Sequence, residues 1–212
     1  MRNVSDIAAN ILSVLFYPLF IPTYGMIFFC RAYSMHATPL PLVWQLVAIF
    51  GTFALTCAIP ISAIWIMVRK GDIKDMQIEN MHERTIPYLY TLFGFGCWSY
   101  FLFSILHAPL SISMISVGAT VAIGLIALIN RWWKISAHLT GTGGFVGGLM
   151  AYCLSIGAIP TIGTMTLFFG LSLLMMWARL RLNAHTDSQV SAGWLLGMIC
   201  TFIPYYIALY AA

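Results

Sequence analysis

The stretch RLRLNAHTDSQVSAG, residues 179–193, separates two long apolar runs of the chain. Residues 139–178 before it and 190–211 after it contain no Asp, Glu, Lys or Arg. The stretch itself gathers two arginines, a histidine, an aspartate and a glutamine: Arg179, Arg181, His185, Asp187 and Gln189. A helix needs about 20 apolar residues to span a bilayer. The pattern therefore predicts a polar loop between membrane helices.

Composition extends this prediction to the whole chain. Of its 212 residues, 61% are apolar and only 8% are charged, whereas a soluble domain averages about 25% charged residues. This number of charged residues is too small to cover a water-facing surface. We therefore expect lipid to surround most of the protein. The size fits a single integral-membrane domain, 1–212. The net charge of +4 is not concentrated in a basic, aromatic-rich patch, so we expect membrane lipids as partners and no nucleic acid.

The apolar runs predict an all-α fold, a polytopic bundle of about six or seven transmembrane helices. The N-terminal run is longer than the core of a signal peptide and is taken as a membrane helix. It could instead form a half-embedded hairpin. The expected crossings are 7–30, 44–68, two within 85–130 broken near 106–111, two within 139–178 broken near 155–163, and 190–211.

Three polar stretches link these helices, at 69–84, 130–138 and 179–189. An even number of expected crossings separates them, so all three should lie on one face of the membrane. Nine of the ten Lys and Arg residues fall on that side, with Arg31 as the exception. The positive-inside rule then predicts a cytoplasmic site face, in a protein of the bacterial inner membrane.

Small residues recur in two further patterns. Glycines cluster in GTGGFVGG, residues 141–148, with a spacing typical of close helix–helix packing in membranes; approach of a ligand to the backbone is the alternative. The five cysteines are far apart in the sequence, and no two of them form a CxxC motif. We therefore interpret them as small buried apolar residues.

The third polar stretch resembles the last signature of the type 2 phosphatidic acid phosphatase superfamily, written SR-x5-H-x3-D. Arg179 and His185 match this signature, and Gln189 stands at the position of its Asp. The segment HTxxQV is similar to that of dolichyl diphosphatases. In the second stretch, KISAHLTG resembles the middle signature PSGH, with Ser136 and His138 at matching positions and Ala137 in place of Gly.

The first stretch resembles the family more loosely. In ERTIPYL, Arg84 matches the arginine of the signature K-x6-RP, and Pro87 is displaced by two positions. Gln77 stands where the family has its Lys, seven residues before the arginine. The resemblance covers about 69–211, and its weight lies in the order and spacing of the three fragments.

The resemblance implies a metal-independent phosphatase that works through a phosphohistidine. His185 would be the nucleophile, His138 the general acid and base, and Gln189 the group that orients His185. Ser136 and Ala137 would help to bind phosphate. The chemistry of the residues agrees, because arginine offers forked donors to phosphate oxygens, which suits Arg84 and Arg179. Backbone N–H groups at a helix start, here Ala137 to Thr140, also bind anions.

We therefore expect a vanadate-sensitive hydrolase of a lipid phosphate or a polyprenyl diphosphate, with no cofactor. A zinc site of His138, His185 and Asp187 is disfavoured, since the chain has no HExxH and no cysteine near either histidine. A non-catalytic lipid-phosphate binding or transport protein is the alternative, and a small channel is a third possibility. Taken singly, His138 could be a helix cap, His185 an interfacial histidine, and Arg179 and Arg181 snorkelling anchors. The oligomeric state stays open.

Overall fold

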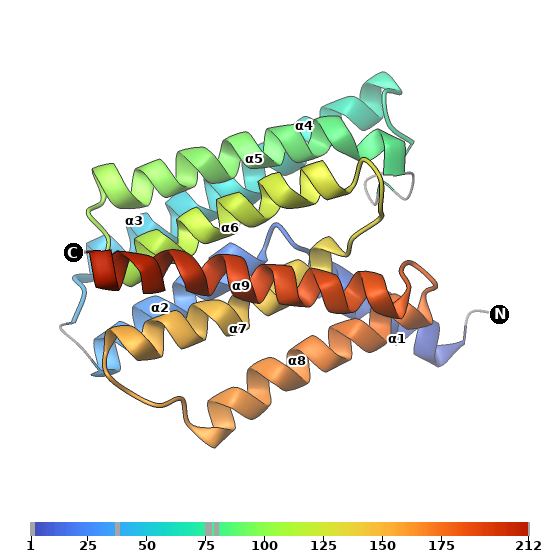
Figure 1. Ribbon diagram of the computed structural model, residues 1–212. Helices are drawn as coiled ribbons and strands as arrows, with labels where there is room; N and C mark the ends of the chain where they lie inside the picture. Colours follow the sequence, from blue (N-terminus) through green and yellow to red (C-terminus); the bar gives the residue numbers. More distant parts are fainter. Residues whose placement is uncertain (1–2, 37–38, 75–77, 79–80, 212) are drawn as a thin grey trace.

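The computed structural model describes residues 3–36, 39–74, 78 and 81–211, and every regular element in these ranges is helical. Five helices are long and apolar enough to cross a membrane: Leu42–Lys70, Thr85–Ile105, Leu110–Ile129, Ile162–Arg181 and Asp187–Tyr210. The chain is thus an all-α integral membrane protein, as the apolar runs predicted. The helices run roughly side by side in one bundle (Figure 1).

The N-terminal apolar run is not one continuous helix over 7–30 but two helices, with a break at Pro18, one of the two prolines in this run that indicate a kink. Helix α1 spans Val4–Leu15 and helix α2 spans Ile21–His36. The break between them contains Pro18, and a proline disfavours helical geometry at the residue before it. At 12 residues, α1 is roughly 18 Å long, shorter than a hydrocarbon core of about 30 Å. It packs against helix α8, whereas α2 packs against α3 and α7.

The next two spans each contain a short π-helical segment. The first consists of α3 (Leu42–Phe53), η1 (Ala54–Ala58) and α4 (Ile59–Lys70). Pro60, which has no backbone N–H to donate, follows η1. The second consists of α5 (Thr85–Tyr100) and η3 (Phe101–Ile105), preceded by the 3-10 turn η2 (Met81–Arg84). Both spans agree with the predicted crossings.

Four helices complete the bundle: α6 (Leu110–Ile129), α7 (Ala137–Ser155), α8 (Ile162–Arg181) and α9 (Asp187–Ala211). Each begins and ends within a few residues of the predicted breaks. Helix α7 is mostly buried along its length, because α2, α6, α8 and α9 all pack against it. The start of α7 therefore lies at the centre of one end of the bundle.

The glycine cluster of α7 serves close helix packing. A Cβ atom at Gly143 would overlap the carbonyl oxygen of Trp194 on α9, and one at Gly147 would overlap that of Met198. On α9, a Cβ at Gly197 would overlap the carbonyl of Thr140 in the same way. The two backbones thus approach as closely as small residues permit, and this contact fixes α7 against α9.

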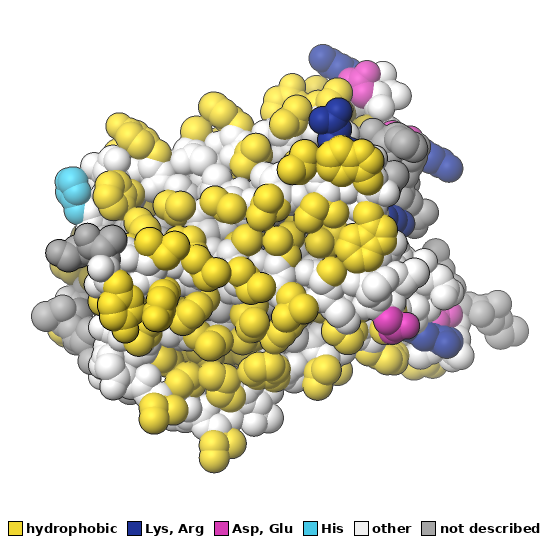
Figure 2. Space-filling model, in the orientation of Figure 1, with side chains coloured by type: hydrophobic (Ala, Val, Ile, Leu, Met, Phe, Trp, Pro, Cys, Tyr) yellow, Lys and Arg dark blue, Asp and Glu magenta, His cyan; other side chains and the backbone are white. Residues whose placement is uncertain are grey.

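The three polar loops lie at one end of the bundle. Figure 1 shows the connections α4–α5, α6–α7 and α8–α9 together at the right, with the N-terminus beside them. The charged side chains visible in Figure 2 gather at the same end, and the rest of that face is largely apolar. The prediction that the loops share one face is therefore confirmed for the fold.

Candidate functional site

The three polar loops and the α1–α2 break surround one pocket at this end of the bundle. Four of the side chains predicted to act on phosphate line it: Arg84, His138, Arg179 and His185. Arg84 ends η2, directly before α5; His138 lies on α7, Arg179 on α8 and His185 in the α8–α9 loop. About 660 Å³ of space lies within the pocket and its mouth. We call it the basic pocket.

His185 is held by two acceptors on one ring nitrogen. Its Nδ1 lies 3.1 Å from the carbonyl oxygen of Lys134 and 3.2 Å from Oε1 of Gln189. A carbonyl oxygen only accepts hydrogen bonds, so Nδ1 must carry the proton. A neutral His185 therefore has its lone pair on Nε2, which is the atom a nucleophilic histidine needs.

The environment of His185 also keeps the ring neutral. The side chain is 8% exposed. Burial, and after it the charges of Arg179 and Arg84, lower the pKa of His185 from 6.5 to about 4, against the opposing effect of its hydrogen bonds to Gln189 and Lys134. An imidazole with this pKa is unprotonated at neutral pH, so it is available to attack an electrophile.

Gln189 links His185 to the start of α9 and to the second polar loop. Its Oε1 accepts a hydrogen bond from the backbone N–H of Thr186 at 3.2 Å as well as from His185. This is the Gln half of a Thr-x-x-Gln capping box at a helix start. The donor at Thr186 also identifies the side-chain atom as the oxygen. The backbone carbonyl of Gln189 accepts from the N–H of Ser136 at 3.3 Å.

The two arginines enter the pocket from different sides. Arg84 is 8% exposed, and its Nε donates to the carbonyl oxygen of Ile78 at 2.7 Å. Arg179 lies in the last turn of α8, and its Nη1 donates to Oγ of Ser13 at 3.2 Å. Both arginines line the same pocket as His185, and both charges lower the pKa of that ring. Two permanent positive charges in one pocket favour the binding of an anion there.

His138 lies in the first turn of α7, against the α1–α2 break. Its Nε2 is 3.1 Å from the carbonyl oxygen of Ser13, and its ring meets that of Tyr17 edge to face at 5.9 Å between centroids. Because that oxygen can only accept, a neutral His138 carries its proton on Nε2. The ring is thus in the pocket wall, with its proton bound by α1.

Ser136 and Ala137 take different positions. The Ser136 side chain is fully buried, and its Oγ accepts from the N–H of Leu139 at 3.4 Å as the N-cap of α7. It does not belong to the pocket lining, whereas Ala137 does. The start of α7 therefore faces the pocket through Ala137 and His138, where its helix dipole favours an anion.

The contribution of α1 was missed by reasoning from sequence. Ser13 contacts both Arg179 and His138, and Tyr17 lines the pocket. Arg181, interpreted as an anchor, forms an ion pair with Asp6 at 2.9 Å and so ties α8 to α1. Asp6 and Ser13 are two of the four polar residues in the sequence of α1, VSDIAANILSVL, and their local pattern does not indicate these contacts.

Two other polar residues lie apart from the pocket, Asp187 and His107. Gln77 falls outside the described residues. Asp187 is exposed in the first turn of α9, and His107 is exposed in the loop before α6, which joins the helices at the other end of the bundle. Within the part of the chain that the structure describes, no three His, Cys, Asp or Glu side chains come together in a way that could hold a metal ion.

No protein-family model, curated protein or solved structure matches this chain. The fold and the pocket therefore define its class by themselves. It is a helical integral membrane protein with a buried pocket at one end, lined by two arginines and two histidines.

Proposed function

We propose that the protein is a metal-independent membrane phosphatase that hydrolyses a lipid phosphate or a polyprenyl diphosphate through a phosphohistidine. The observation that carries the proposal is the basic pocket itself. It brings Arg84, His138, Arg179 and His185 together from four segments of the chain, and it holds His185 in the tautomer and charge state of a nucleophile. The similarity of the three loops to the phosphatidic acid phosphatase signatures adds support.

In the proposed first step, Nε2 of His185 attacks phosphorus and the bond from phosphorus to the leaving oxygen breaks. His138, as an imidazolium, gives a proton to that oxygen and becomes neutral. In the second step, His138 removes a proton from water as the water oxygen attacks the phosphohistidine, which releases phosphate and restores His185. Arg84 and Arg179 stabilise the negative charge on the transferring group, and such electrostatic stabilisation contributes most of the acceleration in many enzymes.

The acid role requires two local changes. Burial, and after it the charge of Arg179, lower the pKa of His138 from 6.5 to about 3, so the ring must take up a second proton when a substrate binds, which the negative charge of a phosphate favours. In the described geometry, the proton on Nε2 of His138 is directed to the carbonyl oxygen of Ser13, so the ring must exchange this acceptor for the substrate oxygen. The same observation favours the alternative function, a protein that binds a lipid phosphate without hydrolysing it. Its mark would be saturable binding of lipid phosphates by a protein that releases no phosphate from them.

The test is phosphate release by the purified protein from a panel of lipid phosphates and polyprenyl diphosphates, with EDTA present. We expect turnover that vanadate inhibits and that His185→Asn abolishes. His107→Asn is the matched control, because His107 is exposed at φ 48° and Asn tolerates that backbone conformation. Turnover that His185→Asn leaves intact would overturn the mechanism, and binding without turnover would establish the alternative.

The membrane and face are part of the proposal. The long apolar helices make the protein an integral membrane protein, and we assign it to the bacterial inner membrane with the pocket at the cytoplasmic face, on the charge bias of the loops. Cysteine labelling of the exposed Lys74 position in intact cells tests the orientation. Labelling by an impermeant reagent from outside would place the pocket on the other face.

A further inference from the structure

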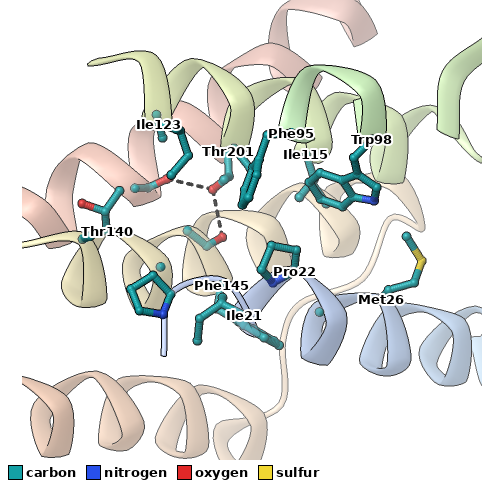
Figure 3. A pocket seen from close by; sticks show the side chains of 18 of the residues that line it. Ile21, Pro22, Met26, Phe95, Trp98, Ile115, Ile123, Thr140, Phe145 and Thr201 are labelled. Atoms are coloured by element: carbon teal, nitrogen blue, oxygen red, sulfur yellow. Dashed lines mark hydrogen bonds between the residues drawn. The ribbon is translucent and has the colours of Figure 1, made fainter. Parts of the chain in front are cut away.

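A second pocket lies deeper in the bundle and is almost entirely apolar. It runs between α2, α5, α6, α7 and α9, and about 730 Å³ of space lies within it and its mouth. Figure 3 shows it from close by, with Ile123 and Thr140 at one end and Met26 and Trp98 at the other. We call it the apolar pocket.

The few polar groups in its lining already have partners. The indole N–H of Trp98 donates to Oγ1 of Thr52 at 2.9 Å. The Thr140 hydroxyl donates to the carbonyl of Ser136 at 3.0 Å, and the Thr201 hydroxyl donates to that of Gly144 at 2.9 Å. The pocket therefore offers an occupant apolar contacts and no free hydrogen-bonding group from these side chains, which suits a hydrocarbon and disfavours a polar ligand.

The apolar pocket adjoins the basic pocket. Pro18, Ile123 and Ala137 line both of them. Ala137 directly precedes His138, the proposed proton donor to the leaving oxygen, so the shared wall lies beside the point where a lipid chain would be attached. The break between α1 and α2 brings Pro18 to this wall, which gives that interruption of the N-terminal helix a role.

The dimensions of the apolar pocket fit one chain. Its lining on α6 extends from Ile112 to Ile126, which at about 1.5 Å per residue is roughly 20 Å. Dividing about 730 Å³ by that length gives a mean cross-section of roughly 36 Å², an upper limit because the volume includes the mouth. Apolar groups approach to about 4.0–4.5 Å, so one chain takes about 16–20 Å² and two take about 32–40 Å². One chain therefore fits easily, whereas two would need nearly all of the volume, including the mouth.

We propose that the apolar pocket holds the hydrocarbon chain of the substrate inside the protein, and that the substrate is a single-chain lipid phosphate. This inference rests on the proposed function, because it takes the basic pocket as the phosphate site. With its phosphate between the two arginines, the substrate would pass Ala137, and its hydrocarbon chain would lie along α6 inside the bundle. The chain would not lie outside the bundle in the bilayer. The depth of the pocket limits the length of chain it covers.

A pair of variants on α6 tests where the chain lies. Ala119 lines the apolar pocket about midway along α6, whereas Val121 is 47% exposed on the outside of the bundle. We compare kcat/KM for geranylgeranyl phosphate with that for dimethylallyl phosphate. Ala119→Phe should lower this ratio about tenfold or more, the equivalent of roughly two fewer buried methylene groups. Val121→Phe adds the same ring on the lipid side and should leave the ratio unchanged.

Two results of this comparison would overturn the inference. One is an equal effect of the two variants on the ratio, which would place the chain outside. The other is hydrolysis of dioleoyl phosphatidic acid by the wild-type protein as fast as geranylgeranyl phosphate, which would show that two chains fit. Hydrolysis of the short substrate by Ala119→Phe confirms that this variant is folded.

Cross-linking tests the same inference without catalysis. A geranylgeranyl phosphonate with a diazirine at the chain end should label peptides that contain Met26, Trp98 or Ile115, and excess geranylgeranyl phosphate should prevent it. Labelling confined to lipid-facing positions such as Phe93, which is 70% exposed, would overturn the inference. If the protein hydrolyses nothing but the probe labels the apolar pocket, the proposed catalysis fails and the chain site stands.

Discussion

Replacement of Gln189 by leucine separates the two interactions that hold His185. Leucine has a similar size but no oxygen, so the hydrogen bonds from His185 and Thr186 to Oε1, both 3.2 Å long, are lost. The bond from Nδ1 of His185 to the Lys134 carbonyl, at 3.1 Å, remains. The ring therefore keeps one acceptor, its tautomer and its approximate orientation.

The expected losses follow from these contacts. One neutral hydrogen bond contributes about 0.5–1.5 kcal/mol, so kcat/KM for phosphate release should fall about 2- to 13-fold. Loss of the capping interaction at Thr186 should cost about 1 kcal/mol of stability, which lowers the melting temperature by roughly 2–4 °C in a chain of this size. Phosphate release and a thermal melt in detergent measure the two effects on one preparation.

Asp187→Asn is the matched control for Gln189→Leu, because Asp187 is exposed two residues earlier in the same turn. It should leave kcat/KM unchanged within the error of measurement, and loss of a negative charge in the first turn of α9 should cost at most about 0.3–1 kcal/mol of stability. A loss in kcat/KM above about a thousandfold for Gln189→Leu would refute the reasoning, since the Lys134 carbonyl would then not hold the ring. Unchanged activity and melting would show that Gln189 makes neither bond in the working protein.

Three further predictions concern charge and packing. The pKa of His185 should be about 4. Between pH 4 and pH 6.5 the unfolded chain binds a proton on this histidine and the folded protein does not. The unfolding free energy should therefore fall by up to about 1.4 kcal/mol per pH unit as the pH decreases. An NMR titration of His185 with a midpoint near 6.5 would contradict this. Gly143→Ala should destabilise the protein by about 1–3 kcal/mol through overlap with α9, whereas Gly170→Ala, with no atoms near the new methyl group, should be neutral or slightly stabilising in the same melt. Asp6→Asn should cost at most about 1 kcal/mol, because its ion pair with Arg181 is partly exposed, and a larger loss would show that this pair holds α1 in place.

Much of the fold could be predicted from the sequence because the length of an apolar run is a local property. Counting the runs then shows which loops lie on the same side of the membrane. The breaks near 106–111 and 155–163 lie where polar or proline-containing segments interrupt long apolar runs. The interruption after α1 was harder to predict, since Pro18 lies in a run that is apolar on both sides. A break made of apolar residues leaves the hydropathy pattern unchanged. Only the backbone restriction of proline therefore indicated the interruption.

The candidate site was predictable only in part, for a physical reason. Arg84, His138, Arg179 and His185 are polar residues in loops or at helix ends, and their spacing indicated a shared site. The contacts of Ser13 with Arg179 and His138 join positions more than a hundred residues apart, and no local pattern encodes them. Ser136 was expected to face phosphate, but its hydroxyl is in the N-cap of α7.

Gln189 shows how one residue can satisfy two requirements. The Thr-x-x-Gln spacing that suits the start of α9 also places Oε1 against Nδ1 of His185. An aspartate at this position would have a shorter side chain and would add a charge that raises the pKa of His185. Glutamine keeps the ring neutral and oriented, which agrees with a nucleophile in a strongly basic pocket.

Direct detection of phosphate on His185 tests the central claim most sharply. The protein is mixed with geranylgeranyl phosphate labelled with ³²P, quenched in alkali within its first turnover, digested and mapped by mass spectrometry. The proposal predicts alkali-stable, acid-labile phosphate on the peptide that contains His185, and none in the His185→Asn variant. Rapid turnover with no phosphate on the protein, or with phosphate on another residue, would contradict it.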